Sequence, residues 1–132
     1  MKALQHSFQE SVIGFAFVCG SILFTVYGQL IVKWQVNKAG SLPSGGWEKM
    51  AFLAKLVVNP WVLSAMAAGF GALLCWLAAM TKFELSYAYP FMSLAFILVL
   101  ILSVFFFNES LTAAKVMGVL LVMAGIAVAS RG

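Results

Sequence analysis

One uncharged stretch decides the class of fold, VIGFAFVCGSILFTVYGQLIV at residues 12–32. At about 1.5 Å of rise per helical residue, this stretch reaches roughly 30 Å, which matches the hydrocarbon core of a bilayer. Backbone groups in lipid must be paired within the segment, so the stretch is expected to be an α-helix. It is also longer than the apolar part of a typical signal peptide. The stretch therefore predicts the first membrane-spanning helix.

Three further apolar runs, at residues 61–80, 87–107 and 111–129, have similar lengths. Of the 132 residues, 64% are hydrophobic and 9% are charged, whereas about a quarter of a soluble protein is charged. The sequence predicts an all-α membrane protein with a single four-helix transmembrane domain over residues 1–132. Because four helices rarely enclose both a substrate path and their own packing core, a dimer is expected. No soluble part remains for catalytic residues, so we do not expect an enzyme.

The longest connection, residues 33–60, joins the first two spans. Its middle is rich in Gly, Ser and Pro, which indicates a loop. In residues 47–58 apolar side chains recur with helical spacing, and Glu48, Lys49 and Lys55 cluster on the opposite face. We expect an amphipathic helix in the headgroup layer. An early extension of the second span is the alternative.

The basic residues are scattered singly at the ends of the apolar runs. Such residues anchor helices to lipid phosphates and set topology, so the net charge of +4 does not indicate a nucleic-acid partner. Five lie on the side of the first and third loops and three on the other: Lys33, Lys38, Lys49, Lys55 and Lys115 against Lys2, Lys82 and Arg131. This margin favours a cytoplasmic position for the first and third loops.

The remaining metal-binding and redox residues indicate neither a metal site nor a disulfide. His6 is the single histidine and has no companion ligand nearby in the sequence. Cys19 and Cys75 both fall within predicted spans, where a thiol usually behaves as a small apolar group. No metal and no cofactor are expected.

A polar stripe crosses the first span, at Ser21, Thr25, Gln29 and Lys33, and is bordered by Tyr27. The four-residue spacing predicts one slanting helix face. Gln29 is the most informative member, because its helix cannot satisfy all four hydrogen-bonding sites of a primary amide. We expect the stripe to bind substrate. Alternatively, the Ser and Thr hydroxyls bond their own helix backbone, and Lys33 anchors the helix end.

Further polar side chains open the third span. Tyr89 and Ser93 are four positions apart, so they can present hydroxyls on one face and add to the substrate site. Pro90 between them is tolerated near a helix start. Interfacial anchoring is the alternative role for Tyr89. Glu84, just before this helix, is a candidate for contacting the substrate headgroup or for gating, paired with a basic group at the membrane surface. Alternatively, Glu84 is simply solvated. Tyr27 is a second candidate for a headgroup or gating role.

No acidic residue lies inside any predicted span, since the carboxylates are Glu10, Glu48, Glu84 and Glu109. A membrane transporter for cations normally needs a buried carboxylate to compensate a desolvated positive charge. The pattern therefore favours an anionic headgroup over a cationic drug. With no titratable group along the path, transport is expected to proceed without proton antiport.

Small residues recur along the fourth span, at Ala114, Gly118, Gly125 and Ala129. In lipid, close backbone approach helps to decide which helix faces associate. The stripe predicts a helix–helix contact, either between two copies of the chain or within one bundle.

Several of these motifs resemble the small four-helix, small multidrug resistance-like members of the drug/metabolite transporter superfamily. The similar stretches are residues 25–33, 88–94 and 108–111, together with the glycine-bearing last helix. The resemblance is most specific for aminoarabinose–phosphoundecaprenol flippase subunits. These share Gly28-Gln29-Leu30 with Lys33, and Tyr89-Pro90 followed by Ser93-Leu94. The likeness covers nearly the whole chain except the long first loop.

Two departures separate the chain from the multidrug branch of that superfamily. Thr25 occupies the place of the glutamate that binds drug and protons there, and Met92 replaces a tryptophan that stacks on aromatic drugs. The resemblance thus implies a flippase for a polyprenyl-phosphate-linked sugar, of the aminoarabinose type or similar. It would act in the bacterial inner membrane, in cell-envelope glycan or lipid A (lipopolysaccharide) modification.

The same resemblance implies the partners, namely the sugar lipid, membrane lipids and a second four-helix subunit, either identical or similar. Two alternatives from other functional classes stay open. One is a small multidrug-type exporter of lipophilic cations. The other is a non-transporting membrane subunit that supports a partner enzyme.

Overall fold

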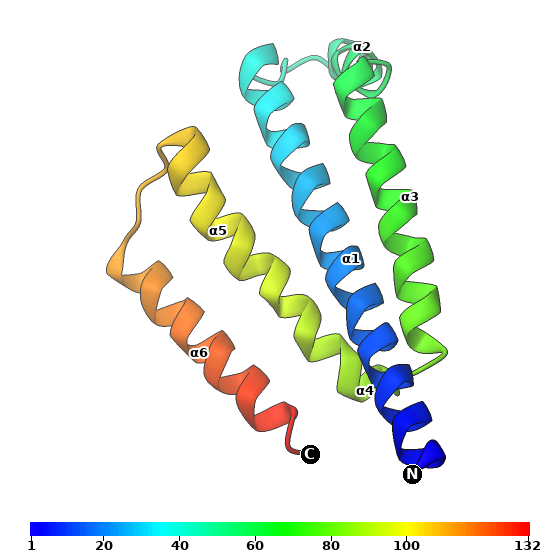
Figure 1. Ribbon diagram of the computed structural model, residues 1–132. Helices are drawn as coiled ribbons and strands as arrows, with labels where there is room; N and C mark the ends of the chain where they lie inside the picture. Colours follow the sequence, from blue (N-terminus) through cyan, green and yellow to red (C-terminus); the bar gives the residue numbers. More distant parts are fainter.

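The computed structural model describes all 132 residues, and nearly all of them are helical (Figure 1). The elements in chain order are α1 (Lys2–Ala39), α2 (Gly46–Val57), α3 (Pro60–Met80), α4 (Leu85–Ala88), the 3-10 helix η1 (Tyr89–Met92), α5 (Ser93–Phe107) and α6 (Ala113–Ala129). α1 is the central helix, because it packs against α3 on one side and α5 on the other. α6 lies beyond α5, at the edge of the row (Figure 1). The predicted all-α fold is confirmed.

Three helical segments are long and apolar enough to cross a membrane, namely Lys2–Ala39, Pro60–Met80 and Leu85–Phe107. α6 is a shorter apolar helix of 17 residues. Successive long helices run in opposite directions, and both termini lie at the same end of the molecule (Figure 1). The chain is therefore built as a multi-pass membrane protein.

α1 is much longer than its apolar stretch, with 38 residues. The prediction that the first connection begins at Lys33 was wrong, because the helix continues to Ala39. The drop in hydrophobicity at Lys33 marks the end of the apolar, membrane-spanning stretch of α1 and not the end of the helix. The first helix-breaking residue is Gly40, which has φ +92°, a conformation that glycine adopts without steric cost.

The predicted helix at residues 47–58 is confirmed as α2, one residue earlier at each end. It is separate from α3, so an early extension of the second span is excluded. Asn59 ends the connection by accepting a hydrogen bond from the Trp61 backbone N–H at 2.9 Å, and Pro60 occupies the first turn of α3. Figure 1 shows α2 nearly end-on, at the end of the molecule where α1 ends and α3 begins. Its location in the headgroup layer stays a prediction.

The third span begins two residues earlier than predicted, at Leu85, and its helix is interrupted. Pro90 has no N–H to donate, and its ring would collide with the carbonyl four residues earlier in a regular α-helix. The chain adopts the tighter η1 turn there before α5 begins. The span therefore changes from α-helical to 3-10 geometry at Tyr89–Met92 and returns to α-helix at Ser93.

The fourth span begins later than predicted, at Ala113 instead of Leu111. α5 ends at Phe107, and the next residue, Asn108, has a left-handed backbone with φ 51° and acts as the C-terminal cap. Thr112 caps α6, since its Oγ1 accepts the Lys115 backbone N–H at 3.3 Å. The turn between these two caps sets Lys115 in the first turn of α6.

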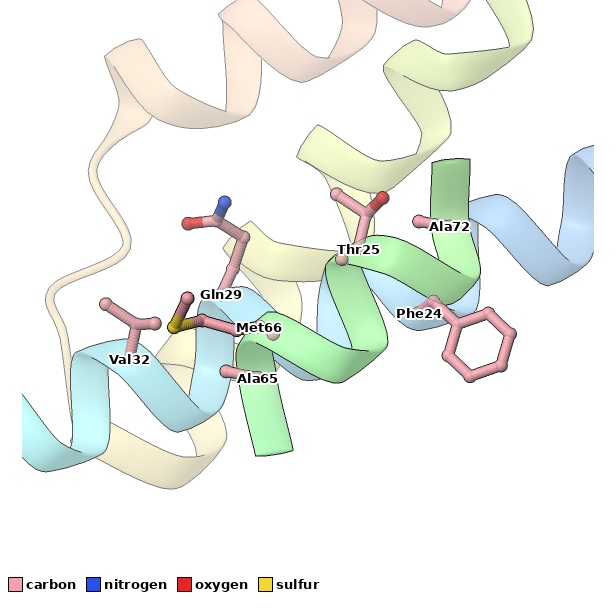
Figure 2. Close-up of a pocket in the computed structure, with 9 residues that line it drawn as sticks. Phe24, Thr25, Gln29, Val32, Ala65, Met66 and Ala72 are labelled. Carbon is pink, nitrogen blue, oxygen red and sulfur yellow. The ribbon is translucent and has the colours of Figure 1, made fainter. Parts of the chain in front are cut away.

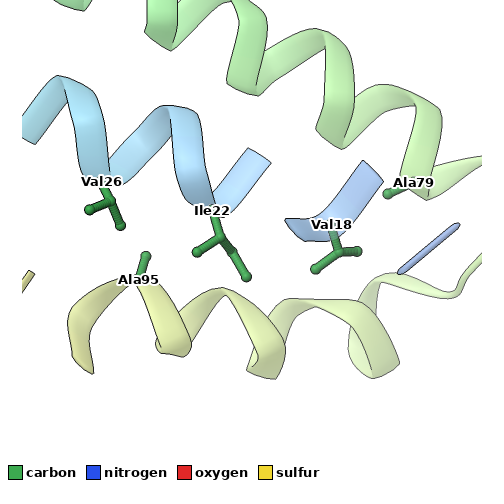
Figure 3. Packing of buried hydrophobic residues seen from close by; sticks show 5 residues of the cluster. All are labelled: Val18, Ile22, Val26, Ala79 and Ala95. Atoms are coloured by element: carbon green, nitrogen blue, oxygen red, sulfur yellow. The ribbon is translucent and has the colours of Figure 1, made fainter. Parts of the chain in front are cut away.

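The apolar core lies between α1 and α5, with one residue from α3 (Figure 3). It consists of Val18, Ile22, Val26, Ala79 and Ala95, each at most 8% exposed. Figure 3 shows the three α1 side chains directed toward α5. This contact fixes the rotation of α1 about its axis and therefore decides which neighbour each polar residue of α1 faces.

A second face of α1, roughly 110° around the axis from the first, carries residues spaced by seven, namely Gly14, Ser21, Gly28 and Gln35. Ser21 and Gly28 of this face pack against α3, whereas Gly14 lies against Phe83 just beyond the end of α3. The Ser21 hydroxyl donates to the Ala72 carbonyl across the interface at 3.0 Å. A Cβ atom at Gly28 would lie 3.4 Å from the Ala65 carbonyl oxygen. A seven-residue repeat keeps one face turned toward a neighbouring helix, and small residues allow close backbone approach in lipid.

Candidate functional site

Five polar side chains gather in one cavity between α1, α5 and the start of α6, which we call the lysine cavity. Its volume is about 370 Å³. The polar lining residues are Gln29, Lys33, Ser103, Glu109 and Lys115. The other half of the lining is hydrophobic. An apolar pocket with a few convergent polar groups is the usual form of a ligand site.

The charges in the lysine cavity are partly paired. Lys33 Nζ lies 3.8 Å from Glu109 Oε1, and the two side chains are 49% and 35% exposed. An ion pair with this exposure adds little stability, so it can be exchanged for another partner. Lys115 Nζ donates to the Ser110 carbonyl at 2.8 Å. Two lysines against one glutamate leave an excess of positive charge, which suits an anion.

Gln29 also borders a second cavity, of about 260 Å³, between α1 and α3. Figure 2 shows Gln29 and Thr25 directed to one side of α1 and Phe24 to the opposite side. The amide of Gln29 has no hydrogen-bond partner within the chain, although it lines both cavities. It is therefore free to hydrogen-bond a polar group in either cavity.

The other predicted members of the α1 stripe are engaged in packing. Ser21 is buried against α3 by its bond to Ala72, so it does not reach the lysine cavity. Thr25 donates to the Ser21 carbonyl at 2.8 Å, the backbone bond that was its alternative role, although it still lines the α1–α3 cavity. Tyr27 faces α3, with its hydroxyl 3.1 Å from Ser64 Oγ.

The predicted residues of the third span lie away from the lysine cavity. Tyr89 is 66% exposed, and its ring packs edge-on against Trp76 at 6.1 Å between centroids. Ser93 begins α5, whereas Ser103 of the lysine cavity lies ten residues further on, roughly 15 Å along the axis. Glu84 is exposed at the start of α4, outside both ion pairs of the chain. The expected single site containing all these residues is therefore not formed.

The small-residue stripe of α6 does not take part in packing within the chain. A Cβ atom added at Gly118 or Gly125 would meet no atom within 4 Å. Ala114 is exposed and Ala129 is only half-buried. Packing within one bundle, one of the two alternatives for this stripe, is thus not observed.

Sequence reasoning missed three residues of the lysine cavity, namely Ser103, Glu109 and Lys115. A usable signal existed for two of them. Spans that alternate in direction place the end of the first helix and the start of the fourth at the same side of the membrane. Lys33, Glu109 and Lys115 could therefore have been grouped before the structure was known. Ser103 carried no signal, because serine is common in spans.

Comparison with known proteins agrees with this architecture. The model of the EamA-like transporter family matches residues 2–131. The probable 4-amino-4-deoxy-L-arabinose-phosphoundecaprenol flippase subunit ArnF of Aeromonas hydrophila is 38% identical over 123 residues, covering 89% of this chain and 79% of the relative. The corresponding subunit ArnE of Pseudomonas aeruginosa strain LESB58 is 34% identical over 117 residues, covering 88% and 96%. No solved structure matches.

The family match spans nearly the whole chain, and the relatives are those that the motifs of α1 and η1 indicated. The predicted resemblance is thus confirmed, and so is the expectation that the protein is not an enzyme, since the family is one of transporters. The chain belongs to the EamA-like transporter family and is homologous to flippase subunits named for an aminoarabinose-linked lipid.

Proposed function

We propose that the chain is a subunit of a flippase that moves a polyprenyl-phosphate-linked sugar across the bacterial inner membrane, for modification of lipid A or another envelope glycan. The observation that supports this most is the convergence of Gln29, Lys33 and Lys115 in one cavity between the membrane-spanning helices. Two ammonium groups and an amide suit a phosphate and hydroxyls. The names of the homologous subunits supply the type of lipid.

The physical task of such a protein is limited to the headgroup. The polyprenyl tail stays in the bilayer, while the phosphate and sugar must cross it. Moving an unpaired hydroxyl or amide into hydrocarbon costs about 2–7 kcal/mol, and a charge costs more. In this proposal Gln29 takes over hydrogen bonds that water provides at the surface, and Lys33 and Lys115 neutralise the phosphate. Thr25, Tyr89 and Ser93 belong to the rest of the path, on the side of α3 and η1.

Reconstitution tests the proposal directly. The purified chain is placed in proteoliposomes, alone and with a second four-helix subunit of the family, with undecaprenyl-phosphate-linked aminoarabinose in one leaflet. We expect flipping above protein-free vesicles that is unchanged by an imposed pH gradient, because the apolar runs contain no acid and the one acid of the lysine cavity, Glu109, lies beside Lys33 and is partly exposed. Dependence on the gradient, or protection of cells from quaternary ammonium compounds without lipid flipping, would favour the cation exporter.

Replacing Glu109 with glutamine (Glu109→Gln) is expected to strengthen binding of the lipid phosphate. In the free protein Glu109 competes with a phosphate for Lys33, from which it lies 3.8 Å away. Removing an exposed ion pair changes the free energy by about 0.2–1 kcal/mol, so affinity for undecaprenyl phosphate should rise up to roughly fivefold. Binding to protein in nanodiscs measures this. Glu48→Gln, on the exposed face of α2, is the matched control, and weaker binding by Glu109→Gln would contradict the competition.

Leucine at Gly118 or Gly125 is expected to prevent pairing with a second subunit. We propose that this face of α6 binds the partner, because a Cβ there meets no atom of the chain itself and small residues favour helix contacts in lipid. Crosslinking in membranes should show loss of the dimer while the monomer remains folded. Ala127→Leu, an exposed position on the other side of α6, is the control. Equal pairing by all variants would place the contact elsewhere.

A further inference from the structure

A second cavity adjoins the lysine cavity and is wholly apolar. It lies between α5 and α6, has a volume of about 300 Å³, and is lined by eight hydrophobic residues, which we call the α5–α6 groove. Leu100 lines both cavities. On α6, Lys115 lines the lysine cavity and the next residue, Val116, lines the groove. The polar and apolar cavities therefore adjoin each other.

The groove occupies a different face of α6 from the small-residue stripe. At about 100° per residue, Val116 points roughly opposite to Gly118 and Gly125. Val119 points roughly at right angles to the two glycines. Both groove residues face α5, whereas the glycine face is open. A partner that covers the glycine face would leave the groove accessible from the bilayer.

We propose that the α5–α6 groove holds the part of the polyprenyl tail next to the phosphate, with the phosphate at Lys33 and Lys115. This inference rests on the proposed function and adds a binding site for the tail. At the roughly 30 Å³ that a water molecule occupies in the liquid, the groove has room for roughly ten heavy atoms, or two isoprene units. The remaining tail stays in the bilayer.

Its position beside the lysine cavity distinguishes the groove from an ordinary lipid-facing surface. A chain in the groove ends beside Leu100 and Lys115, where its headgroup meets the excess positive charge. Phosphate binding alone would not separate a polyprenyl phosphate from an ordinary anionic phospholipid. An apolar groove beside the phosphate, with Val104 on one wall and Val119 on the other, adds contacts with the tail to those with the phosphate.

Two groove-filling variants test the inference, one from each wall, Val119→Phe on α6 and Val104→Phe on α5. The control is Val12→Phe, an exposed position on α1 that lines neither cavity. The probes are undecaprenyl phosphate and the tail-less ethyl phosphate, each measured against the full-length protein in phosphatidylcholine nanodiscs. We expect both groove variants to bind undecaprenyl phosphate about tenfold more weakly, with ethyl phosphate binding and helical circular dichroism unchanged. The control should stay within twofold of wild type.

Three results would overturn the inference. The first is undecaprenyl phosphate binding by both groove variants as tight as that of wild type. The second is an equal loss of ethyl phosphate binding, which would mean that the groove has no role apart from the lysine cavity. The third is equal competition by dioleoylphosphatidylglycerol, which would make the groove a general lipid site. If wild type binds neither phosphate probe, the proposed function itself fails. That result differs from a failure of the tail site alone, in which wild type still binds both probes.

Discussion

Alanine at Lys33 is expected to reduce flipping of the sugar lipid to the background of protein-free vesicles. Lys33 lines the lysine cavity with half of its side chain exposed, so its removal should not unfold the protein. A hydrogen bond to a charged group contributes about 1.5–3 kcal/mol. Losing it weakens phosphate binding by roughly ten- to a hundredfold, and the charge that offsets desolvation of the phosphate is lost as well. Initial flipping rates in proteoliposomes measure the effect.

The control for Lys33→Ala is Lys38→Ala at the same end of α1. The Lys38 ammonium lies over the Trp34 ring, 5.5 Å from its centroid, and does not line the lysine cavity. Its removal changes the charge of the protein by the same amount, so it should leave flipping intact. Gln29→Ala is expected to lose flipping as Lys33→Ala does. Normal flipping by both Gln29→Ala and Lys33→Ala would show that the lysine cavity is not the headgroup site.

The helices were predictable because lipid leaves the backbone few alternatives. An apolar run long enough to span a bilayer must satisfy its own N–H and C=O groups, and the runs at 61–80 and 87–107 end where α3 and α5 end. The true ends of α1 were not predictable in this way. Its turns beyond residues 12–32 carry polar side chains and no helix breaker, so hydropathy has no signal there.

The polar stripe of α1 was predicted as one face, but it turns between two neighbours. Residues four apart on an α-helix differ by about 40° around the axis, so three such steps from Ser21 to Lys33 rotate by about 120°. The stripe therefore begins against α3, where Ser21 bonds Ala72, and ends in the lysine cavity beside Glu109. The sequence spacing gives this rotation. Only the structure, in which Ile22 packs against α5, shows which neighbouring helix lies beside each end of the stripe.

The other parts of the site depended on the turns between spans. Tyr89 and Ser93 were grouped with Gln29 by chemistry, yet they lie at the end of α5 that is remote from Ser103. Glu109 enters the cavity because Asn108 ends α5 in a left-handed conformation and Thr112 starts α6 shortly afterwards. A hydropathy pattern contains no information on the direction of such a turn.

Leucine at Ser21 is expected to have the largest effect on stability of any change within the predicted stripe. Ser21 is 2% exposed and bonds the Ala72 carbonyl, so a larger side chain forces α1 and α3 apart. Overpacking costs about 1–3 kcal/mol, and an interhelical hydrogen bond in a membrane adds about 0.6 kcal/mol, giving roughly 2–4 kcal/mol. Unfolding of the purified protein in a denaturing detergent measures the loss, with Ser11→Leu, exposed on the same helix, as the control.

Alanine at Ser21 separates packing from substrate binding at this position. The smaller side chain fits the α1–α3 interface and loses only the bond to Ala72, so stability should fall by less than about 1 kcal/mol and flipping should continue. If Ser21→Ala instead stopped flipping with stability unchanged, the hydroxyl would have to leave Ala72 and reach the substrate during transport. That result would require the Ser21 hydroxyl to leave the Ala72 carbonyl and turn toward the α1–α3 cavity, which Ala72 also lines.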